Sequence, residues 1–105
     1  MSARILVADD DPKILAFLRR MLTHHGYAVD LAQTGVETLR LVRQREPALL
    51  ILDIMMPHLD GIEVCRRLRA GEVGDGNIAA VPILMLTARD EAEKFMKQIG
   101  LRCDL

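Results

Sequence analysis

The sequence predicts an α/β domain in which helices cover both faces of a doubly wound parallel sheet. Two short apolar runs, residues 5–8 and 48–52, have the composition of strands that are buried on both faces. Segments with helical spacing of their apolar residues alternate with such runs, which is typical of strand–helix–strand units with right-handed crossovers. Both runs end in carboxylates, at residues 9–11 and at Asp53.

The first strand is expected over residues 4–8. The helix after it should begin with Asp11 as its N-cap and Pro12 as its first residue, because a short side-chain acceptor and a fixed φ favour a helix start. Gly26 is a typical helix terminator, so that the next strand is expected over residues 27–31.

The second helix is predicted from a capping box, in which Thr34 and Glu37 are three residues apart. Val36 belongs to its apolar positions, and the helix must stop before Pro47. The central strand then covers residues 48–53 and ends at the second acidic position.

A third helix is expected around residues 62–68, where apolar residues recur every three positions. The glycine-containing connection over residues 70–82 predicts a mobile loop that is remote from the chemistry. A fourth strand follows over residues 82–87, and Asp90 can cap a last helix that ends at Gly100.

Composition predicts a single small domain over residues 1–105, with half of its residues apolar and a net charge of −1. That charge gives no electrostatic reason to expect nucleic-acid or membrane binding. Cys65 and Cys103 have neither metal-ligand spacing nor the density of a disulfide framework, which favours a reducing compartment. With no signal peptide and no apolar span, we expect a cytoplasmic protein.

The carboxyl ends of neighbouring parallel strands meet at one edge of a sheet, so the acidic residues there should lie close together. Two such carboxylates about 4 Å apart repel by about 4 kcal/mol at an effective dielectric near 20. A divalent cation is the simplest means to offset this repulsion. The sequence therefore predicts a divalent-cation site where residues 9–11 and Asp53 meet.

Three segments, residues 5–12, 52–61 and 84–88, resemble in order and spacing the receiver domain of two-component response regulators. The resemblance covers essentially the whole chain. It implies a flavodoxin-like fold with strand order 2-1-3-4. It also implies signalling by phosphoryl transfer from a histidine kinase or a histidine phosphotransfer protein.

By this resemblance, Asp53 is the phosphoacceptor and forms an aspartyl phosphate. Asp10, Asp53 and the backbone carbonyl of Met55 would hold Mg²⁺, together with Asp9 through water. Thr87 would donate a hydrogen bond to the phosphoryl group and move when that group arrives. The chemistry agrees, because a carboxylate attacks an anionic phosphoryl group only when a cation screens the two charges.

The family's fifth strand, with the lysine that ends it, and its fifth helix have no counterpart before Leu105. We therefore expect a C-terminally truncated receiver, a fragment of a longer regulator with an output domain after this point. The apolar edge of the fourth strand would then be open to dimerisation.

Two other functions compete with a phosphorylated switch. A degenerate receiver would bind partners without being phosphorylated, and the missing lysine favours this alternative. A phosphohydrolase with an aspartate nucleophile would need a second acid two residues after Asp53, where Met55 cannot transfer protons. We therefore expect no enzymatic activity on other substrates, only reactions of the chain's own phosphoryl group.

Overall fold

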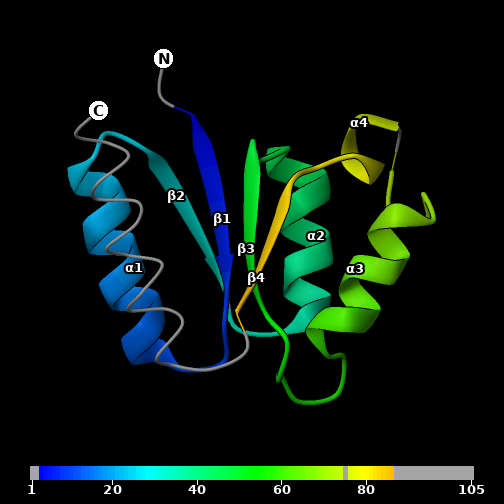
Figure 1. Cartoon of the computed structure of the whole chain (residues 1–105), viewed down its shortest axis with the longest axis horizontal. Helices are drawn as coiled ribbons and strands as arrows, with labels where there is room; N and C mark the ends of the chain where they lie inside the picture. Colours follow the sequence, from blue (N-terminus) through cyan, green and yellow to red (C-terminus); the bar gives the residue numbers. More distant parts are fainter. Residues whose placement is uncertain (1–2, 75, 87–105) are drawn as a thin grey trace.

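The computed structural model describes residues 3–74 and 76–86, which form a four-stranded parallel sheet with the order β2-β1-β3-β4 (Figure 1). In chain order the elements are β1 (Arg4–Ala8), α1 (Pro12–His24), β2 (Ala28–Ala32), α2 (Gly35–Arg45), β3 (Leu49–Asp53), α3 (Gly61–Arg69), α4 (Gly76–Ala79) and β4 (Ile83–Leu86). The predicted fold class and strand order are confirmed.

The sheet is covered on both faces, with α1 on one side and α2 and α3 on the other (Figure 1). Successive residues of a strand point to opposite faces, and the central strand β3 shows this directly. Ile51 packs with the α1 leucines, whereas Leu50 and Leu52 pack with residues of α2 and α3. This two-sided burial explains why the strand sequences are continuously apolar.

Side-chain caps start the helices where the sequence predicts them. The Asp11 carboxylate accepts a hydrogen bond from the Lys13 amide at 2.9 Å, and the Thr34 hydroxyl accepts one from the Glu37 amide at 3.1 Å. Each bond satisfies an amide that has no partner inside its helix. These caps fix the start of α1 and of α2 beside the carboxyl edge of the sheet.

Two local predictions are wrong. The described part of the connection over residues 70–82 is not only a loop, because it contains the helical turn α4 and because Ile78 and Val81 join the core. The second strand begins at Ala28, one residue later than expected.

Some predictions fall outside the described residues. Thr87 and the last helix, with Asp90 as its cap, belong to residues 87–105. Dimerisation through the edge of β4 stays a prediction as well. Within residues 3–74 and 76–86, no helix is long and apolar enough to cross a membrane.

The two-sided core makes the central strand the most sensitive place for truncation. Leu50 is fully buried in β3, so Leu50→Ala should lower the free energy of unfolding by about 2–5 kcal/mol through lost burial and a residual cavity. Chemical denaturation measures this change. Val36→Ala, at an exposed position, is the control and should stay within about 0.5 kcal/mol of the parent. Equal losses in the two variants would contradict the described core.

Candidate metal and phosphoacceptor site

The structure gathers three carboxylates at the carboxyl edge of the sheet. Strands β1 and β3 pair in parallel with Ala8 opposite Leu52, so the residues after β1 and the last residue of β3, Asp53, meet at the same edge. Asp9, Asp10 and Asp53 each offer a carboxylate oxygen there, and these oxygens lie within 4.8 Å of one another. We call these three residues the acidic triad.

Backbone amides orient two members of the triad. An Asp9 carboxylate oxygen accepts a hydrogen bond from the Asp11 amide at 2.8 Å, and Asp53 Oδ1 accepts one from the Met55 amide at 3.1 Å. In both cases the carboxylate binds the amide two residues later, which is the geometry of an Asx turn. Each turn leaves the second carboxylate oxygen to face other groups.

Burial and charge both act on the triad. Burial raises the pKa of Asp9 from 3.8 to about 6, and the nearby carboxylates of Asp53 and Asp10 add to this rise. Burial also raises the pKa of Asp53, with the Asp10 carboxylate as a further cause. Hydrogen bonds from backbone amides oppose both shifts but do not cancel them. The folded chain thus carries a concentrated negative charge that a cation would relieve.

The oxygen-only composition of the triad fits Mg²⁺, a hard cation that binds one or two carboxylates and keeps several waters or phosphate oxygens. Asp9 is buried, Asp53 is half-buried and Asp10 is exposed, so the group is open to solvent on one side. Met55, the other expected ligand, lies beside Asp53 through its amide, and the role of its carbonyl stays a prediction.

The loop after β3, residues 54–60, is packed tightly at its far end. Asp60 caps α3 by accepting a hydrogen bond from the Glu63 amide at 2.9 Å. The Gly61 amide donates to the Ile54 carbonyl at 2.9 Å, and a β-carbon on Gly61 would lie 2.9 Å from the Ile54 α-carbon. Both residues belong to the segment 52–61 that resembles receiver domains, but the sequence analysis did not predict the cap at Asp60 or the close approach at Gly61, although an aspartate followed by glycine at a helix start is a usable signal.

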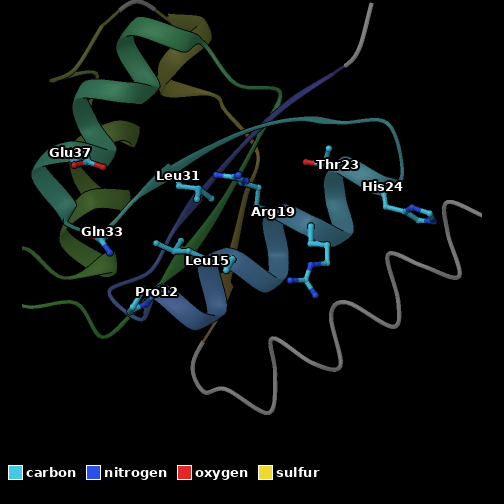
Figure 2. A pocket seen from close by; sticks show the side chains of 10 residues that line it. Pro12, Leu15, Arg19, Thr23, His24, Leu31, Gln33 and Glu37 are labelled. Carbon is cyan, nitrogen blue, oxygen red and sulfur yellow. The ribbon is translucent and has the colours of Figure 1, made fainter.

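A separate groove of about 820 Å³ lies between α1, β2 and the start of α2 (Figure 2). Its lining residues are Pro12, Leu15, Ala16, Arg19, Arg20, Thr23, His24, Leu31, Gln33 and Glu37. No member of the acidic triad belongs to this lining. The triad therefore lies at the sheet edge and not on the floor of this groove.

Comparison with known proteins identifies the family. The model of the response regulator receiver domain matches residues 5–104. The chain belongs to this family. It is 51 % identical over 94 residues to the response regulator MprA of Mycobacterium sp. (strain KMS), a match that covers 90 % of this chain and 38 % of that relative. The chain thus spans well under half the length of the curated relative.

Solved receiver structures agree with the fold. The receiver domain of sensor histidine kinase PA1611 from Pseudomonas aeruginosa PAO1 has a TM-score of 0.75 at 30 % identity, covering 85 % of this chain and 70 % of that one. That structure has a magnesium ion coordinated in its active site cleft. The N-terminal domain of a response regulator receiver protein from Methanoculleus marisnigri JR1 has a TM-score of 0.73 at 35 % identity. The match covers 88 % of this chain and 75 % of that one.

The raised pKa of Asp9 predicts a distinctive pH dependence without metal. Folded Asp9 titrates near pH 6 and the unfolded side chain near 3.8, so the folded state binds more protons between these values. The cost of burying this charge is therefore fully present above pH 6 and disappears as the pH falls below 3.8. Asp9→Asn should stabilise the apo protein by about 2–3 kcal/mol at pH 7.5, and much less near pH 4.

Urea denaturation of both proteins across this pH range measures the difference. Asp60→Asn is the control, because this exposed carboxylate caps α3 outside the triad. The raised pKa would be contradicted if Asp9→Asn and the parent differed in their free energy of unfolding by the same amount at every pH.

Proposed function

We propose that this receiver is a phosphoacceptor switch, in which Asp53 takes a phosphoryl group from a histidine kinase or a histidine phosphotransfer protein. The observation that carries the proposal is the convergence of Asp9, Asp10 and Asp53, whose ligand oxygens lie within 4.8 Å. The family supports it, and so does the magnesium ion in the related PA1611 receiver domain.

The chain's own residues would orient the attacking group. The Met55 amide donates a hydrogen bond to Oδ1 of Asp53, which leaves Oδ2 as the candidate nucleophile. A new P–O bond to Asp53 forms as the P–N bond of the phosphohistidine breaks. The electron pair of the P–N bond returns to the imidazole nitrogen. Mg²⁺, when bound, supplies the positive charge that screens the carboxylate from the phosphoryl oxygens.

Asp10 and Asp53 are proposed as direct ligands, with the Met55 carbonyl, and Asp9 as a ligand through water. Thr87 is proposed to donate a hydrogen bond to the phosphoryl group and to move with it. The chain would catalyse only its own phosphorylation and dephosphorylation, in the cytoplasm. In a longer regulator, its state would be passed to an output domain.

Magnesium should stabilise the folded protein, because the triad exists only in the folded state. At a Mg²⁺ concentration of one hundred times the Kd, the free energy of unfolding should rise by about 2.7 kcal/mol, with a clear increase in Tm. Thermal unfolding with and without Mg²⁺ measures the effect. Asp10→Asn should abolish most of it, whereas Asp60→Asn should respond like the parent. An unchanged Tm in the parent at millimolar Mg²⁺ argues against the metal site.

Phosphorylation should depend on Asp53 and on magnesium. Incubation with acetyl phosphate and Mg²⁺ should add one phosphoryl mass to the protein, as detected by intact mass spectrometry. Asp53→Asn should abolish the adduct, because the amide is not a nucleophile toward phosphorus, and Asp60→Asn should retain it. If the folded, Mg²⁺-binding parent takes no adduct, the chain is instead a degenerate receiver that binds partners without phosphorylation.

A further inference from the structure

We propose that Gly35 is a positioning residue for the magnesium site, because it lets the first turn of α2 support the phosphoacceptor loop, residues 54–60. The inference rests on the proposed function, since it concerns the loop that joins Asp53 to α3. Gly35 itself belongs to α2 and lies far from the loop in sequence. The structure brings the two into direct contact.

The contact between Gly35 and the loop is too close for any side chain. A β-carbon added at Gly35 would overlap the backbone carbonyl oxygen of Leu59 and lie 2.8 Å from the Leu59 β-carbon. Gly35 is buried and has no positive φ that would itself require glycine. The reason for glycine here is therefore the approach of the loop backbone, and not the conformation of the helix.

Helix α2 cannot easily move away from an added side chain. Its first turn is fixed by Thr34, which accepts a hydrogen bond from the Glu37 amide at 3.1 Å. The hydroxyl of the fully buried Thr38 donates to the Thr34 carbonyl at 2.7 Å. One turn further on, Val42 is also fully buried in the core. The overlap would therefore be relieved mainly on the loop side.

The loop is the softer partner. Its segment around Leu59 is held locally by a hydrogen bond of 2.9 Å from the Leu59 amide to the Pro57 carbonyl, and His58 has a positive φ of 68°. Met55 is 74 % exposed. Pro57 and His58 are exposed as well, so few core contacts resist a displacement of these three residues between the anchored ends of the loop.

A displacement of Leu59 has a path to the triad. Met56 is a buried member of the core cluster against which Leu59 packs, and both residues belong to the same short loop. We therefore expect a shift of Leu59 to disturb Met56 and its neighbour Met55. The Met55 amide in turn holds Oδ1 of Asp53. The other end of the loop is fixed where the Gly61 amide binds the Ile54 carbonyl. We therefore expect the backbone to shift between these two hydrogen bonds, in the part of the loop that includes the Met55 carbonyl.

The test is Gly35→Ala, with Mg²⁺ affinity measured by calorimetry on the folded protein. We expect the Kd to rise roughly tenfold, the lower end of the range for residues that orient metal ligands. Gly76→Ala is the matched control, because a β-carbon on Gly76 meets nothing within 4 Å. In amide spectra of the metal-free protein, Gly35→Ala should also shift the signals of Met55 and Leu59.

The outcomes separate the inference from the function on which it rests. A parent protein that does not bind Mg²⁺ would overturn the proposed metal site. In another outcome, the parent protein binds Mg²⁺ while Gly35→Ala is less stable but has the same Mg²⁺ Kd and the same Met55 amide signal. That result would give Gly35 a purely structural role and overturn the inference. If Gly35→Ala does not fold, Leu59→Ala serves as the second test. It removes the part of the Leu59 side chain beyond the β-carbon, on the other side of the contact with Gly35. Its Mg²⁺ affinity should then fall, and an unchanged Kd would overturn the inference equally.

Discussion

The parallel pairing of β1 with β3 is the constraint on which the site depends. Because Ala8 lies opposite Leu52, the chain must place Asp9, Asp10 and Asp53 at one edge of the sheet. Burial and, to a lesser degree, the neighbouring carboxylates raise the pKa of Asp9, so this placement disfavours its charged form. The apolar burial of both strands on two faces supplies the opposing free energy, so the core holds charges together that would otherwise separate.

The triad is also continuous with the helices that surround it. Asp9 accepts from the Asp11 amide, and Asp11 in turn caps α1 by accepting from the Lys13 amide. On the other strand, Asp53 accepts from Met55 at the start of the loop that leads to α3. A new charge at the triad would therefore act on the start of one helix and on the loop before another, without any long pathway.

Local sequence patterns predicted what local forces determine. The caps at Asp11 and Thr34 follow from motifs within a few residues, and the parallel sheet follows from the alternation of strands and helices, whereas the strand order was implied by the resemblance to receiver domains. The apolar residue Val36 helped to predict α2 but is exposed in it, because helical spacing does not say how far an apolar stripe extends around a helix. The contact of Gly35 with Leu59 joins segments distant in sequence, so no motif announces it. Neither the burial of Asp9 nor its pKa could be obtained without the fold.

The energetics of the triad connect metal, proton and phosphoryl group. Burial that raises the pKa of Asp9 to about 6 makes a proton compete with a cation for the same carboxylates near neutral pH. A divalent ion that binds there must displace any proton present, so binding weakens as the pH falls through 6. The same negative charge that attracts the cation repels an incoming phosphoryl group. A site of this composition is therefore suited to phosphoryl transfer only when its cation is already bound, which makes the metal a condition for the proposed switch.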